Sequence, residues 1–242
     1  MNLVVDIGNS SAKYAVFDGS RCVFHCSAAV FDQRVEDCLN GFHPERALVA
    51  AVAPVPQDLL SGLARLQCAV TELSVDTPMP LNIAYESPKT LGVDRLAAAV
   101  GAWKQFQQRD LLVVDMGSCI TYDLVTRDAT YRGGNIAPGM RMRFRSMHDG
   151  TARLPELEWH GETLTPFGHD TASALQGGVV WGILQEMEGY LRKCQQTMPE
   201  VQVVVTGGDG ALLCPKDDDR FIYDELLVAR GLNEILEYNY VR

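Results

Sequence analysis

The stretch "VVDIGNSSAKYAVF", Val4–Phe17, contains two apolar segments separated by a short polar turn with Gly8 and two serines. This pattern predicts two strands joined by a hairpin. Glycine adopts positive φ without a Cβ penalty, so Gly8 and Asn9 are expected to form a two-residue turn. Taken alone, such a stretch is more often an ordinary turn than a binding site.

The same pattern returns in the second half of the chain, in "VVDMGSCITYDLV", Val113–Val125. Each copy has an apolar strand, an Asp-x-Gly step, small polar residues and a second strand. The repeat aligns Asp6 with Asp115 and Gly8 with Gly117. Internal self-similarity of this kind predicts one fold unit that is used twice.

Strand and helix patterns alternate along the rest of the chain, which favours a layered α/β fold. The expected strands cover Leu3–Val5, Ala12–Phe17, Ala47–Val52 and Val201–Val205, the expected helices cover about Thr90–Phe106, Thr171–Cys194 and Asp224–Glu237, and a loop is expected over Arg132–Met140. A polar segment near residues 105–110 predicts the division into an N-terminal half, 1–105, and a C-terminal half, 106–242.

The net charge and the distribution of apolar residues indicate which kinds of binding partner the protein can have. The chain has 242 residues and a formal net charge of −10, which argues against nucleic acid or an anionic membrane as the main partner. No apolar run is long enough to span a bilayer, and no signal-peptide pattern opens the chain, so a cytoplasmic location is expected. Arg141, Arg143 and Arg145 are interpreted as a solvated helix face rather than an RNA-binding patch.

The two polar turns have a chemistry of their own. Backbone N–H groups and hydroxyls in a turn rich in Gly and Ser form a concavity that suits phosphate oxygens. An Asp at the strand end beside it can hold hydrated Mg2+. A third cluster, "TGGDG" over Thr206–Gly210, either lets a backbone lie close to a nucleoside or is an ordinary loop.

The paired hairpins resemble the acetate kinase, sugar kinase, Hsp70 and actin superfamily. Within it, four ordered motifs resemble the type III pantothenate kinase family: "DIGN" at 6–9, "GVDR" at 92–95, "DMGS" at 115–118 and "GGNIAPG" at 133–139. The resemblance implies an actin-like ATPase fold with two duplicated ribonuclease H-like halves, each a mixed sheet flanked by helices. It also implies ATP-dependent phosphorylation of pantothenate to 4'-phosphopantothenate, the first step of coenzyme A biosynthesis.

Two other functions stay open at this point. One is a related small-molecule kinase with another hydroxyl acceptor. The other is a non-catalytic nucleotide-binding regulatory factor, which could retain both hairpins.

The resemblance also implies where ATP and the ions bind. Mg2+ would lie near Asp6, bound through water, and a monovalent cation, K+ or NH4+, near Asp115. Ser10 and Ser118 stand where the family usually has Thr. The implied ATP-binding residues are Asp6, Ile7, Gly8, Asn9, Ser10, Ser11, Ala12, Lys13 and Ser118.

For the acceptor, the resemblance implies contacts with Tyr85, Gly92, Val93, Asp94, Arg95 and Thr171. Asp94 is the expected catalytic base, although an Asp in the first turn of a helix is also explained by the helix dipole. Arg95 suits the carboxylate of pantothenate or a surface salt bridge. Tyr85 is a substrate contact or a buried aromatic, and Thr171 a substrate contact or an N-cap.

The predicted helix from Thr171 contains four glycines, each of which costs about 0.5–1 kcal/mol relative to Ala in a helix interior. Close approach of another backbone would explain them. Since the family is homodimeric, this helix is assigned to the dimer contact. The glycines are Gly177, Gly178, Gly182 and Gly189.

Overall fold

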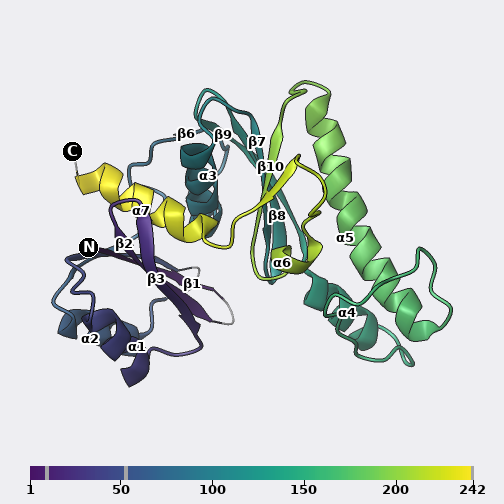
Figure 1. The fold of residues 1–242 in the computed structure, drawn as a ribbon, viewed down its shortest axis with the longest axis horizontal. Coiled ribbons are helices and arrows are strands. Elements are labelled where there is room, and N and C mark those ends of the chain that lie inside the picture. The colour runs from purple at the N-terminus through teal and green to yellow at the C-terminus, as the bar shows by residue number, and fades with distance from the viewer. Residues whose placement is uncertain (9–10, 52–53, 241–242) are drawn as a thin grey trace. The chain divides into compact units, whose positions relative to one another are not determined.

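The computed structural model describes residues 1–8, 11–51 and 54–240. The chain forms two compact units (Figure 1). The first unit contains Met1–Gln107, Asp128–Tyr131 and Leu226–Arg242, and the second contains Gln108–Arg127 and Arg132–Glu225.

The first unit is built on a five-stranded sheet with the order β3-β2-β1-β4-β5. Its strands are β1 (Asn2–Ile7), β2 (Ala12–Asp18), β3 (Arg21–Ala28), β4 (Arg46–Ala51) and β5 (Ala69–Glu72). Strand β1 is antiparallel to β2 and parallel to β4. The sheet is therefore mixed, with the Asp-x-Gly hairpin at its centre.

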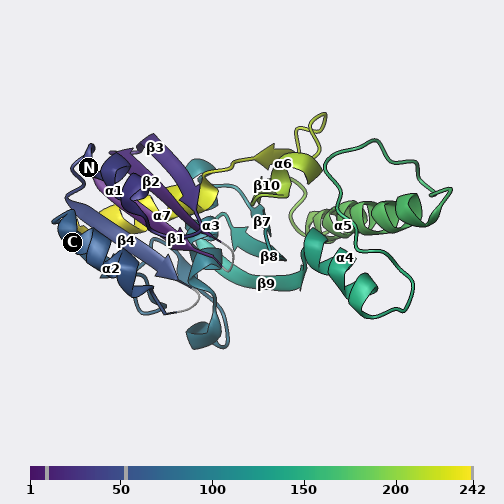
Figure 2. The same ribbon diagram turned by 90° about the horizontal axis from the view of Figure 1, so that it is seen from below.

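Helices cover both faces of this sheet, as Figures 1 and 2 show. They are α1 (Gln33–Asn40) and α2 (Gln57–Arg65) on one face, and α3 (Val93–Gln105) and α7 (Leu227–Tyr240) on the other. Side chains alternate along a strand, so Leu3 and Val5 pack toward α1 and α2, while Val4 points to the opposite face. All three are buried, which explains the continuous apolar run at the start of the chain.

The C-terminal helix is fixed to the first unit by a close crossing with α3. A Cβ on Gly231 would overlap the carbonyl oxygen of Ala97, and one on Gly101 would overlap that of Leu227. The buried residues of α7 include Leu227, Val228, Leu232, Ile235 and Leu236. The sequence prediction assigned this helix to the half 106–242, whereas in the structure residues 226–240 pack with the first unit.

The second unit repeats the strand order of the first. Its sheet runs β11-β10-β7-β8-β9, with strands β7 (Leu111–Met116), β8 (Cys119–Thr126), β9 (Thr130–Pro138), β10 (Gln202–Thr206) and β11 (Phe221–Tyr223). Strand β7 is antiparallel to β8 and parallel to β10, as β1 is to β2 and β4. The predicted use of one fold unit twice is confirmed.

The helices of the second unit are α4 (Met140–Asp149), α5 (Thr171–Gln195) and the short α6 (Gly210–Leu213). Helix α5 lies along the sheet and supplies Val180, Ile183 and Met187 to its buried core (Figure 1). Two small elements precede α3 in the chain, a short strand β6 (Asn82–Ile83), which pairs with the first residues of β9, and a 3-10 helix over Pro88–Thr90.

The predicted loop at 132–140 is wrong, because β9 continues through Pro138. Its glycines serve a strand rather than a loop. Gly133 has a φ of 98°, and a Cβ on Gly134 would overlap the carbonyl oxygen of Tyr122 on β8. Glycine here permits close contact between adjacent strands.

The predicted two-residue turn is also wrong. Ile7 pairs with Ala12, so four residues separate the strands, and the Gly8 N–H donates to Ser11 O over 3.1 Å. Gly8 does not adopt a positive φ. Asn9 and Ser10 lie outside the described residues.

Two helices begin later than the sequence predicted. Helix α3 starts at Val93 rather than at Thr90, because Thr90 belongs to the preceding 3-10 helix. Helix α7 starts at Leu227 rather than at Asp224. Asp224 directly follows β11, and its N–H donates to the carbonyl oxygen of Val205 on β10. The long helix from Thr171 is confirmed as α5.

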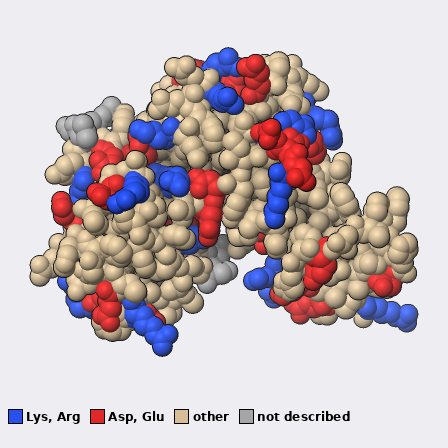
Figure 3. Space-filling view, in the orientation of Figure 1, with Lys and Arg blue, Asp and Glu red and all other residues tan. Residues whose placement is uncertain are grey.

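Surface charge is mixed on the face drawn in Figure 3, where Lys and Arg are interspersed with Asp and Glu. Within the described part of the chain, no helix has the length and hydropathy of a bilayer span. The three arginines of α4 do not form one solvated face. The side chains of Arg141 and Arg145 are 83% and 74% exposed, but that of Arg143 is only 20% exposed because it pairs with Glu186.

We expect Gly231→Ala to destabilise the protein by about 3 kcal/mol or more. The added Cβ would occupy the position of main-chain atoms of α3, so α3 and α7 would have to separate. Urea unfolding measures this. The control is Gly41→Ala, where a Cβ would make only ordinary contacts of at least 3.5 Å and should change stability by about 0.5 kcal/mol or less. Equal stability of the two variants would contradict the close crossing.

Candidate functional site

The first hairpin places an acid at the end of a buried strand. Asp6 follows the buried residues of β1 and lies opposite Lys13 on β2. Lys13 is exposed, and the Ser11 hydroxyl lies 3.3 Å from that of Ser27. The hairpin therefore combines a carboxylate, an amine and hydroxyls next to exposed main chain at Gly8.

Burial raises the pKa of Asp6 to about 6, the positive charge of Lys13 opposes this shift, and the negative charge of Asp94 adds to it. Asp94 comes from the first turn of α3, far from Asp6 in sequence. The electrostatic effect means that the two carboxylates lie close enough to interact, within the first unit.

The conformation of Asp94 depends on the absence of a side chain at Gly92. Asp94 Oδ1 accepts a hydrogen bond from the Arg95 N–H over 2.9 Å. A Cβ on Gly92, the N-cap of α3, would overlap that same oxygen. Gly92 thus leaves the space in which the Asp94 carboxylate lies.

The other predicted acceptor contacts of the first unit are Tyr85, Val93 and Arg95. Arg95 is buried in the first turn of α3, so its side chain does not lie on the surface. Tyr85 is half-buried and meets the fully buried Tyr131 edge-on, with ring centroids 6.1 Å apart. Val93 is half-buried in the first turn of α3.

A cavity of about 230 Å3 lies beside the first hairpin. Tyr14, Phe31 and Leu59, which line it, belong to the apolar cluster under α1 and α2. Because side chains alternate along β1 and β2, Asp6 and Lys13 point to the opposite face of the sheet. The cavity is therefore separated from the carboxylates.

In the second unit, two segments pack directly against the β7–β8 hairpin. Asp115 lies opposite Thr121, and the exposed Ser118 forms the turn, which is closed by a Gly117 N–H donating to Cys119 O over 3.0 Å. The Gly139 N–H donates to Ser118 O over 3.2 Å. A Cβ on Gly139 would lie 2.6 Å from Ser118 O, so only glycine fits there.

The third glycine cluster reaches the same hairpin. Gly207 has a φ of 88°, and a Cβ there would lie 2.6 Å from Asp115 Oδ1. The Asp209 N–H donates to Met116 O over 3.1 Å. The "TGGDG" segment therefore belongs to the second hairpin site rather than to a separate loop.

Asp209 is a candidate functional residue that the sequence reasoning did not single out. Burial raises the pKa of its carboxyl group, and the positive charge of Arg141 opposes the shift. The signal available in the sequence was an acid inside a glycine cluster at the end of a strand.

Thr171 is exposed at the first position of α5. It is not the N-cap, because Asp170 has that role and accepts a hydrogen bond from the Ser173 N–H over 2.8 Å. Hydrogen bonds from the main-chain N–H and the hydroxyl of Ser173 lower the pKa of Asp170. The N-cap alternative for Thr171 is therefore excluded.

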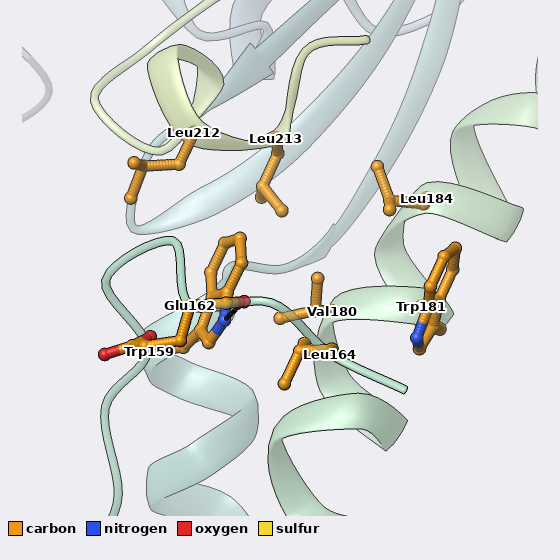
Figure 4. Close-up of a pocket in the computed structure, with 8 residues that line it drawn as sticks. All are labelled: Trp159, Glu162, Leu164, Val180, Trp181, Leu184, Leu212 and Leu213. Carbon is orange, nitrogen blue, oxygen red and sulfur yellow. Dashed lines mark hydrogen bonds between the residues drawn. The ribbon is translucent and has the colours of Figure 1, made fainter. Parts of the chain in front are cut away.

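A second cavity, of about 150 Å3, lies between α5, α6 and the segment before α5 (Figure 4). Its lining is apolar except for Glu162, whose carboxylate accepts a hydrogen bond from the His160 N–H over 2.8 Å. Such a lining offers no cation for a phosphate. It consists of Trp159, Glu162, Leu164, Val180, Trp181, Leu184, Leu212 and Leu213.

The residues present fit Mg2+ that is held mainly by waters and phosphates, because Mg2+ bound with a nucleotide usually takes one or two carboxylates from the protein. Asp6 supplies one carboxylate. Among the described residues, no group of three or more His, Cys, Asp and Glu side chains is arranged as a metal cage. A monovalent cation near Asp115 would find that carboxylate and the neighbouring main-chain oxygens.

Comparison with known proteins identifies the family. The model of the type III pantothenate kinase family matches residues 2–193. A type III pantothenate kinase from Phocaeicola vulgatus is 40% identical over 245 residues, which covers 99% of each chain. This chain belongs to the type III pantothenate kinase family.

Solved structures agree with the fold expected for a type III pantothenate kinase. A Campylobacter jejuni protein described as a Baf family transcriptional activator is 25% identical with a TM-score of 0.65, over 99% of this chain and 100% of that one. A Sinorhizobium meliloti protein described as a 2-dehydro-3-deoxygalactonokinase is 14% identical with a TM-score of 0.58, over 99% of both chains, and supports the fold alone. The predicted pair of mixed sheets with flanking helices is confirmed.

Because the pKa of Asp6 is raised, we expect the free energy of unfolding of this member of the type III pantothenate kinase family to depend on pH. A carboxyl group whose pKa is higher in the folded state stabilises the fold below its unfolded pKa, and that contribution is lost as the pH rises through about 6. We expect Asp6→Asn to stabilise the ligand-free protein by about 1–2 kcal/mol at pH 8 and by about half as much at pH 5.

Urea unfolding at the two pH values measures this difference. Asp18→Asn, which removes the same charge from a 61% exposed side chain in the same unit, is the control. A gain in stability that is the same at pH 5 and pH 8 would contradict the effect of burial on Asp6.

Proposed function

We propose that the protein transfers the γ-phosphoryl group of ATP to the primary hydroxyl of pantothenate, forming 4'-phosphopantothenate in the first step of coenzyme A biosynthesis. The observation that carries the proposal is the near full-length likeness to type III pantothenate kinases. The hydrogen bond from the Arg95 N–H and the space left by Gly92, which fix the carboxylate of the expected base, also support it.

The first unit would hold the phosphates of Mg-ATP through its hairpin. The Ser11 hydroxyl is a hydrogen-bond donor and the Lys13 ammonium a cation, both of which phosphates need, and the exposed Gly8 has no side chain to block their approach. Asp6 would orient a water of the Mg2+ shell. Mg2+ supplies charge neutralisation for the phosphates when it is bound. Ile7 and Ala12 flank this loop, and Asn9 and Ser10 complete the proposed ATP-binding residues.

Asp94 would orient the hydroxyl of pantothenate and accept its proton. The hydroxyl oxygen forms a bond to the γ-phosphorus while the bond from that phosphorus to the bridging oxygen of ADP breaks. The transition state of such a transfer is loose, so orientation by Asp94 contributes more than strong basicity. Arg95 would bind the carboxylate of pantothenate, with Tyr85, Gly92, Val93 and Thr171 as further contacts.

The second hairpin would bind nucleotide and a monovalent cation. Ser118 is exposed in its turn, and Asp115 supplies a carboxylate. K+ or NH4+ at Asp115 would offset the repulsion between this carboxylate and the ATP phosphates. The expected location is the cytoplasm.

The test is the release of ADP on addition of pantothenate, measured with potassium and with sodium. We expect turnover in potassium, and a loss of about 10²–10⁴-fold in Asp94→Asn, because the amide cannot accept the hydroxyl proton and offers one acceptor oxygen in place of two for orienting the hydroxyl. Gly92→Ala should cause a smaller loss by displacing the Asp94 carboxylate, whereas Gly41→Ala should leave the rate unchanged.

Three outcomes contradict parts of this proposal. If Asp94→Asn released ADP at the wild-type rate, Asp94 would not be the catalytic base. Turnover of another hydroxyl acceptor but not of pantothenate would favour a related kinase. Binding of ATP without turnover of any acceptor would favour a non-catalytic regulator, the alternative that the name of the Campylobacter jejuni relative supports.

A homodimer that uses α5 is also part of the proposal. Trp181 is 39% exposed on this helix, and a Cβ on Gly178 or Gly189 would meet nothing within 4 Å in the chain itself. These glycines therefore have no packing reason within the described chain. A second copy of the chain could approach them closely.

We expect sedimentation at micromolar concentration to give a dimer, and Trp181→Glu to shift it toward the monomer by placing a charge in the contact. Val30→Glu, which adds a charge at a 62% exposed position of the first unit, is the control. A wild-type protein that sediments only as a monomer would exclude this contact.

A further inference from the structure

Arg143 is half-buried in the second unit, in contrast to the exposed Arg141 and Arg145 on α4. Its side chain is 20% exposed, and its Nη2 donates to Glu186 Oε2 on α5 over 2.6 Å. The same guanidinium donates from Nε to the carbonyl oxygen of Pro138 over 2.8 Å. One side chain therefore joins α5 to the last residue of β9 by two charge-assisted hydrogen bonds.

The carbonyl that Arg143 holds belongs to the segment that closes on the second hairpin. Pro138 is followed by Gly139, whose N–H donates to Ser118 O and whose Cα packs against the backbone of Gly117 and Ser118. A shift of Pro138 would therefore move the contact on Ser118. The path from Glu186 to Ser118 passes only through direct contacts within one unit.

The surroundings fit a guanidinium and not a smaller cation. A Cβ on Gly182 of α5 would lie 3.9 Å from Arg143 Nη1, so this glycine leaves the group ordinary contact distance. Tyr122 of β8 is buried, stacks on Tyr190 of α5 with ring centroids 4.2 Å apart, and is close enough for Glu186 and Arg143 to influence its pKa. The fork geometry of Arg allows both hydrogen bonds at once, whereas Lys can direct only a point charge.

We infer that Arg143 is a positioning residue that, through Pro138 and Gly139, holds the second hairpin in the geometry in which Ser118 meets the nucleotide. This inference rests on the proposed binding of ATP by Ser118. Arg143 and Glu186 touch neither substrate, so their effect is on the affinity for ATP. Of the proposed pantothenate contacts, only Thr171 is on α5, and it is the first residue of that helix whereas Glu186 lies in its second half, so the affinity for pantothenate changes little.

The test compares Arg143→Ala with Arg145→Ala, which removes the same charge from the same helix at a 74% exposed position. Two quantities are measured: Mg-ATP affinity by titration without pantothenate, and amide exchange at Gly139. We expect Arg143→Ala to weaken Mg-ATP binding by about tenfold and to speed exchange at Gly139. Arg145→Ala should change neither, and Arg143→Lys should restore only part of the affinity.

Glu186→Gln provides a second variant in case Arg143→Ala does not fold. It should weaken Mg-ATP binding less than Arg143→Ala does, because Arg143 keeps its hydrogen bond to Pro138. In steady state, the KM for ATP should rise while the KM for pantothenate stays within about twofold. Unchanged ATP affinity, or unchanged exchange at Gly139, would overturn the inference. Absence of pantothenate turnover in the wild type would instead count against the proposed function, because binding and exchange are measured without pantothenate.

Discussion

Both units depend on a carboxylate that is fixed at the end of a buried strand. Asp6 and Asp115 occupy the same position, one residue before the end of β1 and of β7. The residues before each acid are buried in the core, so the main chain that carries the carboxylate cannot move without exposing apolar surface. Each acid is thereby held in place before any ligand binds, which is the condition for electrostatic preorganisation.

The two carboxylates differ in what surrounds them. Asp6 has Lys13 across the strand pair and feels the charge of Asp94, so its site combines both signs. Asp115 lies between the neutral residues Thr121 and Thr206. The cross-strand partners of the two duplicated acids therefore differ, with a lysine beside Asp6 and threonines beside Asp115.

Local patterns were enough to predict the hairpins, the repeat and the helices α3, α5 and α7. The errors came from glycine, which in sequence indicates a loop but in the structure permits close packing of backbones. Gly133 and Gly134 lie in a strand, and Gly231 fixes α7 to the first unit. These contacts are between distant parts of the chain, so no local pattern could reveal them.

The same limitation applied to the site. The motifs indicated Asp6, Asp94 and Asp115, and the structure adds that Asp94 interacts with Asp6. The role of Arg143 was misread, because three arginines at alternate positions on a helix give no sign of which one points inward. Only its contacts with Pro138 and Glu186 distinguish it from Arg145.

The second hairpin shows how the fold limits variation at such a site. Gly139 and Gly207 approach it from two sides, and a Cβ at either position would meet main-chain atoms that cannot rotate away. The backbone of Gly117 and Ser118 is therefore positioned by other backbone, while the Ser118 side chain stays exposed. This separation explains how Ser can stand where the family usually has Thr. The side chain can change by a methyl group, since the backbone that carries the hydroxyl is held by main-chain contacts in which the Ser118 side chain takes no part.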